Sequence, residues 1–459
     1  MTETVKIISP IDGSVYAERS LASPAEIEGA ISRAKSARHA WGETTIAERQ
    51  KILSHFVDAL LLMNDDIVPE LAWQIGRPVR FDGEQRGVEE RSRYMIELAA
   101  EALAPAMRPE KPGFTRYITR EALGTVMVIA PWNYPFLTAV NSIVPGLMAG
   151  NSIILKHASQ TLLAGERFAA AAESAGLPAG LFQNLVLGHA DTEKLIASGA
   201  IDHINFTGSV EGGRRIERAA AGTFATLGLE LGGKDPAYVR ADADLDNAVE
   251  SLVDGSFFNS GQSCCGVERI YVHEAVYGSF VERFVDNARG WALGNPLDAD
   301  TIVGPMARGN FADHVRQQTD EAIRGGATRH LNTRHELDRP GSPYLAPEVL
   351  TGVNHQMSVM REESFGPVVG IMKVADDAEA VTLMNDSPFG LTASIWTRDL
   401  DAAASLGGSI ETGTVFANRC DYLDPALVWT GVKDTGKGGG LSEIGYANLT
   451  QPKSYHLKA

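Results

Sequence analysis

The pattern of apolar and polar positions changes partway along the chain. The first hundred residues mostly predict helices, because Ser23-Pro24 begins one helical pattern and residues 47–62 repeat apolar side chains at helical spacing. From about Tyr117, short apolar runs alternate with helical stretches. The runs are residues 124–130, 152–155, 203–206 and 227–231, and the helical stretches include residues 162–174 and 212–221. Strands that alternate with helices predict parallel βαβ units, which bind ligands beyond the carboxyl ends of their strands.

Polar motifs follow three of these predicted strands. Pro131-Trp132-Asn133 follows the first strand, Lys156 the second, and Thr207-Gly208-Ser209 the third. Because the carboxyl ends of parallel strands meet at one edge of a sheet, we expect the three motifs to gather at one mouth.

A second region of alternating pattern begins near Gly233. Asp244 suits the N-cap of a helix that has apolar residues at the 3.6-residue period and is expected to end at Gly261. Those apolar residues are Leu245, Ala248, Val249, Leu252 and Val253. Short apolar runs at residues 270–272, 368–372 and 392–396 predict a second α/β domain that extends to about residue 434. In the tail, Tyr455-His456-Leu457 predicts a strand that pairs with another element.

Length and charge narrow the class of protein. At 459 residues the chain predicts two or three domains, at roughly 150 residues per domain. A net charge of −17 argues against binding of nucleic acid or an anionic membrane, because both attract basic surfaces. The N-terminus lacks the apolar stretch of a signal peptide, and no run approaches about 18 apolar residues. We therefore expect a cytoplasmic protein without nucleic-acid or membrane partners.

The cysteines supply the first candidate for chemistry. Cys264, Cys265 and Cys420 are too few for a disulfide framework and fit a reducing compartment. Cys264 lies in a glycine-rich turn, Gly261 to Gly266, that would let a substrate approach its thiol. The alternative is that Cys264 is a small hydrophobic side chain of the core. We expect no metal site.

Glu230 supplies the second candidate. It lies inside the apolar run at residues 227–231 and is followed by Gly232-Gly233. Burial of a carboxylate is costly unless the group has a task or a partner. Glu230 is therefore either a functional group or a buried acid that is paired with a nearby Lys or Arg.

Together the motifs resemble those of the aldehyde dehydrogenase superfamily in sequence, order and separation. Residues 131–135 resemble the family's oxyanion motif, residues 156–161 its ribose-binding segment, and residues 206–209 its pyrophosphate turn. The Glu230 and Cys264 motifs follow in the family's order, and the later matches are residues 294–296, 304–305, 362–367, 385–391 and Asn418. The resemblance covers nearly the whole chain.

The resemblance implies an α/β fold with a Rossmann-type cofactor domain, an α/β catalytic domain and a small β oligomerisation arm. The cofactor domain would comprise residues 1–103 and 123–232, and the catalytic domain residues 233–434. The arm would comprise a projecting hairpin at residues 104–122 and the segment 435–459, which would lay a strand beside a partner subunit's sheet. We therefore expect a homodimer or a homotetramer.

The resemblance also implies the oxidation of an aldehyde to a carboxylic acid with NADP or NAD. Cys264 would be the nucleophile that forms a thioester, Glu230 the base that activates water, and Asn133 a donor to the oxyanion. The residues implied in cofactor binding are Trp132, Lys156, Ser159, Gly208, Ser209, Gly213, Glu363 and Phe365. The residues implied in lining the aldehyde tunnel are Tyr134, Leu137, Thr138, Asn141, Phe258, Arg419, Cys420, Asp421 and Leu423.

The chain departs from the family's usual pattern at three places. His157 replaces a proline, and Ser159 replaces a glutamate that commonly holds the adenosine ribose. Without that carboxylate, Lys156, Ser159 and His157 would suit a 2′-phosphate, so we expect NADP to be accepted. The alternative is that Ser159 only fills space and that NAD is preferred through other contacts. The third departure is at residues 433–441, which are not followed by the Arg-Glu pair that is frequent in the family. This difference bears on the junction between the domains.

The residues leave some alternatives open. Arg419 either anchors an anionic aldehyde such as a semialdehyde or pairs with Asp421. A cysteine hydrolase would need a histidine beside its thiol, and no signature of one is present. Retention of Cys264, Glu230, Asn133 and Lys156 argues against a non-enzymatic member, and Glu230 argues against a member that acylates CoA.

Overall fold

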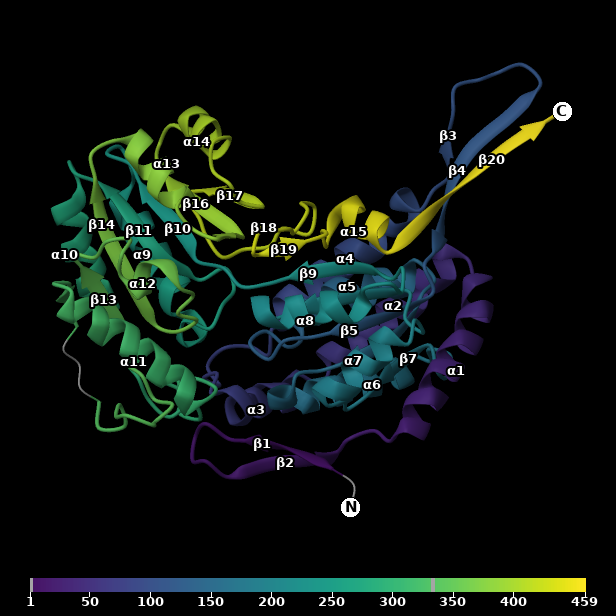
Figure 1. The fold of residues 1–459 in the computed structure, drawn as a ribbon, viewed down its shortest axis with the longest axis horizontal. Helices are drawn as coiled ribbons and strands as arrows, with labels where there is room; N and C mark the ends of the chain where they lie inside the picture. Colours follow the sequence, from purple (N-terminus) through teal and green to yellow (C-terminus); the bar gives the residue numbers. More distant parts are fainter. Residues whose placement is uncertain (1–2, 332–334) are drawn as a thin grey trace.

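Two β-sheets, each flanked by helices, form the two lobes of the computed structural model (Figure 1). The structure describes residues 3–331 and 335–459. The first sheet has the order β19-β9-β8-β5-β6-β7, and the second has the order β12-β13-β14-β11-β10-β16-β17. Each sheet is parallel except for one antiparallel edge strand, β19 or β12. The strands of the first sheet are β5 (Thr125–Ile129), β6 (Ser152–Lys156), β7 (Phe182–Asn184), β8 (His203–Thr207), β9 (Thr226–Glu230) and β19 (Gly436–Lys437), and those of the second are β10 (Asp235–Val239), β11 (Val267–His273), β12 (Thr328–Arg329), β13 (Glu348–Thr351), β14 (Val368–Val374), β16 (Thr392–Trp396) and β17 (Thr414–Ala417).

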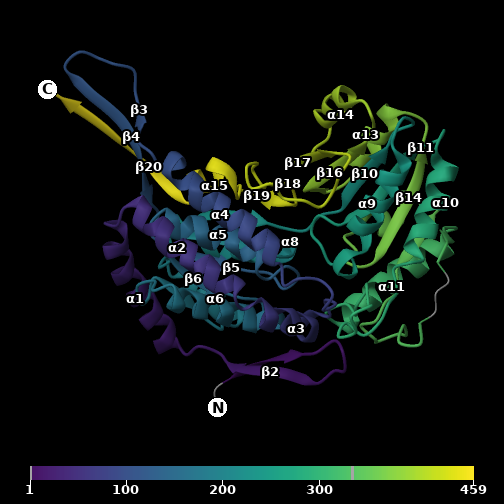
Figure 2. The same ribbon diagram turned by 180° about the vertical axis from the view of Figure 1, so that it is seen from behind.

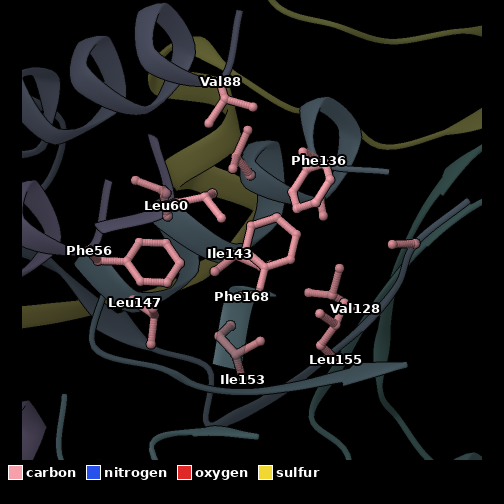
Figure 3. Close-up of a cluster of buried hydrophobic side chains, with 14 of the residues drawn as sticks. Phe56, Leu60, Val88, Val128, Phe136, Ile143, Leu147, Ile153, Leu155 and Phe168 are labelled. Carbon is pink, nitrogen blue, oxygen red and sulfur yellow. The ribbon is translucent and has the colours of Figure 1, made fainter. Parts of the chain in front are cut away.

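The central strands of the first sheet are buried on both faces. In β5, Val126 and Val128 lie in one apolar cluster, whereas Met127 and Ile129 lie in another. Side chains alternate across a strand, so burial of both faces explains the continuous apolar runs in the sequence. Figure 3 shows the first cluster, where aromatic and aliphatic side chains of the covering helices meet those of the sheet. The helices of the first cluster include α2 (Ile46–Leu61), α3 (Asn64–Ile75), α4 (Gln85–Ala102), α5 (Leu137–Met148) and α6 (Leu162–Ser174), and those of the second include α1 (Pro24–Gly42), α7 (His189–Ala197) and α8 (Val210–Ala220).

The second sheet is packed between helices in the same way. Along β10, Tyr238 lies in one apolar cluster, whereas Ala237 and Val239 lie in another. The helices of the first of these clusters are α11 (Gly309–Arg324), α12 (Ser358–Arg361), α13 (Asp377–Asn385) and α14 (Leu400–Gly407), and those of the second are α9 (Leu245–Phe257) and α10 (Tyr277–Ala288).

Helices begin where the sequence signals them. The Ser23 side chain accepts a hydrogen bond from the Glu26 N–H, and the Glu26 carboxylate accepts one from the Ser23 N–H, which caps α1. Asp244 caps α9 by accepting from two backbone N–H groups, as predicted. The helix itself ends at Phe257, and a short 3₁₀ turn, η2 (Phe258–Gly261), completes the span that was expected to be helical.

The first twenty residues differ from the helical expectation. β1 (Thr4–Ile8) and β2 (Val15–Ser20) form an antiparallel hairpin that lies along the edge of the molecule (Figure 1). The hairpin is held by contacts with distant residues, because Gln160 donates to the Ile8 carbonyl at 3.0 Å and Arg19 pairs with Glu166 at 2.5 Å. A local pattern of apolar residues carries no signal of such contacts.

A three-stranded sheet projects from the first lobe, as both views show (Figures 1 and 2). It consists of β3 (Ala106–Met107) and β4 (Phe114–Ala122), which form an antiparallel hairpin, and of β20 (Thr450–Lys458), which pairs with β4 along its length. The segment before β20 does not project. Instead, β19 pairs with β9 of the first sheet, and α15 (Ser442–Asn448) packs against α4. Within the predicted segment 435–459, therefore, only β20 belongs to this sheet, and the division of the chain into domains stays a prediction.

Two shorter strands, β15 (Phe389–Gly390) and β18 (Val432–Lys433), pair near the junction of the lobes. Across residues 3–331 and 335–459, no helix has both the length and the apolarity that a membrane crossing requires.

Candidate active site

Two cavities meet at Cys264 and Glu230. A cleft of about 610 Å³ runs along the carboxyl ends of the strands in the first sheet, and a second cavity of about 250 Å³ lies beside α4 and α5. The residues that line both are Thr138, Thr207, Glu230, Leu231 and Cys264. The three polar motifs predicted to share one mouth do so, because Trp132, Lys156 and Ser209 all line the cleft. A thiol and a carboxylate thus lie where a ligand in the cleft and one in the cavity would meet.

A strained turn holds Cys264. Asn259 and Ser260 in η2 have φ values of 51° and 57°, which residues other than glycine rarely adopt. The Asn259 side chain stabilises the turn by donating to the carbonyl oxygens of Asn133 at 3.2 Å and Gln262 at 3.3 Å. Cys264 itself is half-buried, and its backbone N–H has no hydrogen-bond partner among the described residues.

Asn133 is fixed against this turn. Its side chain is 5% exposed and donates through Nδ2 to the Gln262 carbonyl at 3.1 Å. Its own carbonyl accepts from Arg77 Nη2 at 2.5 Å and from Asn259. One hydrogen of the Asn133 amide is therefore used within the protein, and the second remains for a ligand.

A buried ion pair supports the Asn133 segment. Arg77 and Glu84 lie 2.6 Å apart with side chains 3% exposed. The Glu84 carboxylate also accepts from the N–H groups of Phe136 and Leu137, which are unpaired donors at the start of α5. Neither residue was identified from the sequence, because both lie in a polar stretch between helices and the backbone groups that they bind, at residues 133–137, are far away in the chain.

Glu230 ends β9 and points toward the junction of the cavities. Its Oε2 accepts from Thr207 Oγ1 at 3.2 Å. Burial raises the pKa of Glu230 to about 7, against the opposing effects of the Thr207 hydrogen bond and of Arg91. The alternative of an ion pair with a nearby Lys or Arg is wrong, because no described cation forms an ion pair with Glu230 and Lys234 pairs with Glu268. A carboxylate with this pKa can accept and release a proton near neutral pH.

The glycines after Glu230 allow the two motifs to approach each other. A Cβ atom on Gly233 would lie 2.2 Å from the carbonyl oxygen of Cys264, which is closer than any carbon can approach. Glycine at this position is therefore required for the end of β9 to pass the Cys264 turn.

A second buried ion pair positions the segment with Glu363 and Phe365. Lys234 Nζ lies 2.5 Å from Glu268, whose carboxylate accepts from the N–H groups of Ser364 and Phe365. Glu363 accepts from the Gly233 N–H at 2.9 Å, and burial raises the pKa of Glu363 to about 7. Sequence reasoning missed Lys234 and Glu268, although Lys234 stands directly beside the Glu230 motif.

Most of the remaining predicted cofactor residues line the cleft, whereas Gly213 does not. Trp132 lines it and packs its ring edge-on against Phe365, with centroids 5.5 Å apart. Gly208 and Ser209 line it at the start of α8, where Ser209 accepts from the Gly212 N–H. Gly213 contributes through packing, because a Cβ there would lie 2.6 Å from the Leu231 side chain.

The segment after Lys156 requires one correction. His157 is buried and hydrogen-bonded to the Pro135 carbonyl and to Thr161, and burial lowers the pKa of His157 to about 4. It is neutral at pH 7, so the expectation that it adds positive charge for a phosphate is wrong. Ser159 begins a short 3₁₀ turn and is half-buried beside Ala158, which lines the cleft.

The smaller cavity contains most of the residues predicted for the aldehyde tunnel. Those that line it are Tyr134, Leu137, Thr138, Asn141, Phe258, Asp421 and Leu423, together with Arg91 and Asp254, which were not predicted.

Arg419 is exposed and stacks its guanidinium on Tyr422, 3.8 Å from the ring centroid. The pairing of Arg419 with Asp421 is therefore wrong, since Asp421 instead accepts from Cys265 Sγ at 2.7 Å. Arg419 is not among the residues that line the cavity, and its contact with an anionic aldehyde stays a prediction. Cys420 packs beneath the cavity wall against α9.

No cluster of three His, Cys, Asp or Glu residues suitable for a metal ion occurs within the described part of the chain.

Comparison with known proteins identifies the family. The sequence model of the aldehyde dehydrogenase family matches residues 1–455. The chain belongs to the aldehyde dehydrogenase family. It is an NAD(P)-dependent enzyme that oxidises an aldehyde to a carboxylic acid.

Three relatives illustrate the extent of the similarity. The chain is 33% identical to a succinate-semialdehyde dehydrogenase [NADP(+)] of Mycobacterium avium, over 98% of this chain and 96% of that protein. It is also 33% identical to the succinate semialdehyde dehydrogenase [NAD(P)+] Sad of Escherichia coli, over 95% and 94%. The crystal structure of a succinate-semialdehyde dehydrogenase from Burkholderia pseudomallei superposes with a TM-score of 0.95 at 29% identity, over 100% and 95%. The predicted family and fold class are confirmed.

Proposed function

We propose that Cys264, Glu230 and Asn133 carry out the oxidation, and that the cleft of the first sheet holds the dinucleotide. The observation that carries this proposal is that Cys264 and Glu230 line both cavities, so that one thiol can reach an aldehyde on one side and a nicotinamide on the other. The nicotinamide ring, when bound, accepts a hydride.

The first half of the reaction forms a thioester. The Cys264 thiolate attacks the aldehyde carbon, and the carbonyl oxygen becomes an oxyanion. The free N–H of Asn133 and the backbone N–H of Cys264 donate to this oxyanion. Loss of hydride from the same carbon then restores the carbonyl and leaves an acyl group on sulfur.

The second half releases the acid. Glu230 takes a proton from a water molecule, which attacks the thioester carbon and expels the Cys264 sulfur. Two changes test this chemistry. Removal of the Cys264 thiol must stop formation of the thioester, and removal of the Glu230 carboxylate must slow release of the acid.

The cleft fits a dinucleotide. Ser209 and the first N–H groups of α8 lie at a helix N-terminus, where a pyrophosphate is stabilised. Glu363 and Phe365 lie on the same cleft near Cys264, in positions to hold the nicotinamide ribose and ring. Lys156 ends β6, three strands away from β9, and would reach the adenosine ribose.

We propose that the enzyme accepts NADP and prefers it to NAD. The described acids that line the cleft, Glu230 and Glu363, lie at the β9 side of the sheet. A 2′-phosphate beside Lys156 would therefore meet a cation without a competing carboxylate. Two of the relatives are named for NADP(+) or NAD(P)+, which agrees with the acceptance of NADP.

Introducing a carboxylate three residues after Lys156 should weaken NADP use. In Ser159→Glu, kcat/KM for NADP should fall by roughly tenfold or more, because the new charge repels the 2′-phosphate. The value for NAD should change little. Ser159→Gln is the matched control, since it adds the same bulk without charge, and it should keep NADP use. Wild-type enzyme that rejects NADP would contradict the proposal.

We also propose that the projecting sheet joins subunits in a homodimer or homotetramer. Met107 and Leu457 on this sheet are 65% and 50% exposed, and the sheet extends away from the lobe without a core of its own (Figure 2). Such a sheet is stable when another surface covers it. Sedimentation at micromolar concentration should give at least twice the 49.2 kDa mass of the chain. A species of one-chain mass would contradict the proposal.

A further inference from the structure

The smaller cavity is lined by a buried arginine side chain that forms no direct ion pair with a described residue. Arg91 of α4 lines this cavity and is 6% exposed. Its Nη1 donates to the Leu137 carbonyl at 3.2 Å, whereas Nε and Nη2 have no hydrogen-bond partner among the described residues. It also forms no ion pair with any described carboxylate. Buried charges are normally paired, because the protein interior does not replace the lost water.

The acids near Arg91 have other partners. The groups that act on Arg91 electrostatically are Cys265, Glu84, Glu230 and Asp421. Glu84 pairs with Arg77, Asp421 accepts from Cys265, and Glu230 accepts from Thr207. Asp254, the other acid of the cavity wall, is exposed. None of these acids forms a hydrogen bond or an ion pair with Arg91, so the guanidinium edge formed by Nε and Nη2 has no direct partner among the described residues.

A second unsatisfied side chain lines the same cavity. Asn141 of α5 is 4% exposed, and neither its Nδ2 nor its Oδ1 has a partner among the described residues. The helices α4 and α5 pack together, so that Arg91 and Asn141 contribute to one wall. Buried polar atoms without partners cost free energy, which a ligand that bonds to them would recover.

We propose that Arg91, assisted by Asn141 Nδ2, binds a carboxylate at the far end of the substrate, so that the preferred substrates are short ω-oxo carboxylic acids. A guanidinium presents two parallel N–H groups, which match the two oxygens of a carboxylate. The role that the sequence suggested for Arg419 thus belongs to Arg91, which lines the same cavity as Cys264.

The size of the cavity fits this class of substrate. About 250 Å³ is several times the roughly 30 Å³ that one water molecule takes up in the liquid. The cavity therefore has room for an oxo acid of about four or five carbons. Its aldehyde would lie at Cys264, so the inference rests on the proposed role of that thiol.

The first test compares two substrates of similar length in the wild-type enzyme. Succinic semialdehyde carries the carboxylate, and its methyl ester is a neutral analogue. The acid should show a kcat/KM about ten- to a hundredfold higher than the ester, because only the acid satisfies the guanidinium. Succinate should also inhibit oxidation of butyraldehyde competitively. Equal use of the acid and the ester would overturn the proposal.

The second test removes the cation. Arg91→Gln should raise KM for succinic semialdehyde by about ten- to a hundredfold while kcat/KM for the ester changes little. Arg91→Lys keeps the charge and should retain part of the preference. The matched control is Arg93→Gln on the exposed side of α4, which should behave as wild type because Arg93 pairs with Asp58 and Glu89 at the surface. An equal loss for both substrates in Arg91→Gln would show that Arg91 is structural.

The outcomes separate this inference from the proposed chemistry. If neither compound reduces the cofactor while butyraldehyde does, the inferred substrate class fails and the chemistry at Cys264 and Glu230 stands. If Cys264→Ala oxidises the aldehydes as the wild type does, the assignment of Cys264 fails. If both are oxidised equally well, only the role of Arg91 fails. Should Arg91→Gln not fold, as thermal unfolding would reveal, Arg91→Lys and succinate inhibition of the wild-type enzyme still decide the question.

Discussion

Replacing Cys264 by alanine is expected to reduce aldehyde oxidation by roughly a million-fold, to the background rate, because the nucleophile is lost and no other thiol faces both cavities. Steady-state formation of the reduced cofactor measures this loss. Dinucleotide binding should remain nearly intact, since the cleft walls are unchanged. Quenching of tryptophan fluorescence can report that binding, because Trp132 lines the cleft.

Cys420→Ala is the matched control for this experiment. It removes a thiol that packs beneath the wall and donates to the Ser251 carbonyl at 3.4 Å, so it should leave turnover close to that of the wild type. Substantial residual oxidation by Cys264→Ala would exclude Cys264 as the nucleophile.

Replacing Glu230 by glutamine is expected to separate the two halves of the reaction. The amide keeps the shape of the side chain but cannot take a proton from water, so release of the acid should slow by about a hundred- to ten-thousandfold. Acyl transfer to Cys264 and hydride loss do not need this base. Rapid mixing should therefore show a burst of roughly one reduced cofactor per subunit before a slow steady state.

The pH dependence provides an independent check on Glu230. Burial raises the pKa of Glu230 to about 7, and only the deprotonated carboxylate can accept a proton. Where acid release limits turnover, kcat should therefore rise with pH up to about 7 and level off above it. The Gln variant should lack this rise. Turnover of the variant at the wild-type rate would remove Glu230 from the mechanism.

The apolar pattern predicted the central strands well, and the reason is local. The run at residues 152–155 became β6, and that at residues 392–396 became β16. Parallel strands buried on both faces are mostly apolar along their length, so a single stretch of sequence carries the information. The N-terminal hairpin escaped prediction because contacts such as that of Gln160 with Ile8 join parts of the chain that are remote in sequence.

The sequence by itself determined the family and the reaction through its ordered motifs. It also predicted where the chemistry takes place, because motifs at strand ends must gather at one edge of a parallel sheet. It determined Cys264 and Glu230 as the candidates for catalysis through their glycine-rich surroundings. Only the tertiary structure decided which charges are paired. In the structure, Arg77 pairs with Glu84, and Lys234 pairs with Glu268. His157 is buried and neutral. Arg419 lies outside the substrate cavity, whereas Arg91 lines it without an ion pair. The physical reason is that pairing and burial depend on which distant segments the fold brings into contact, whereas the strand and turn signals lie within a few neighbouring residues.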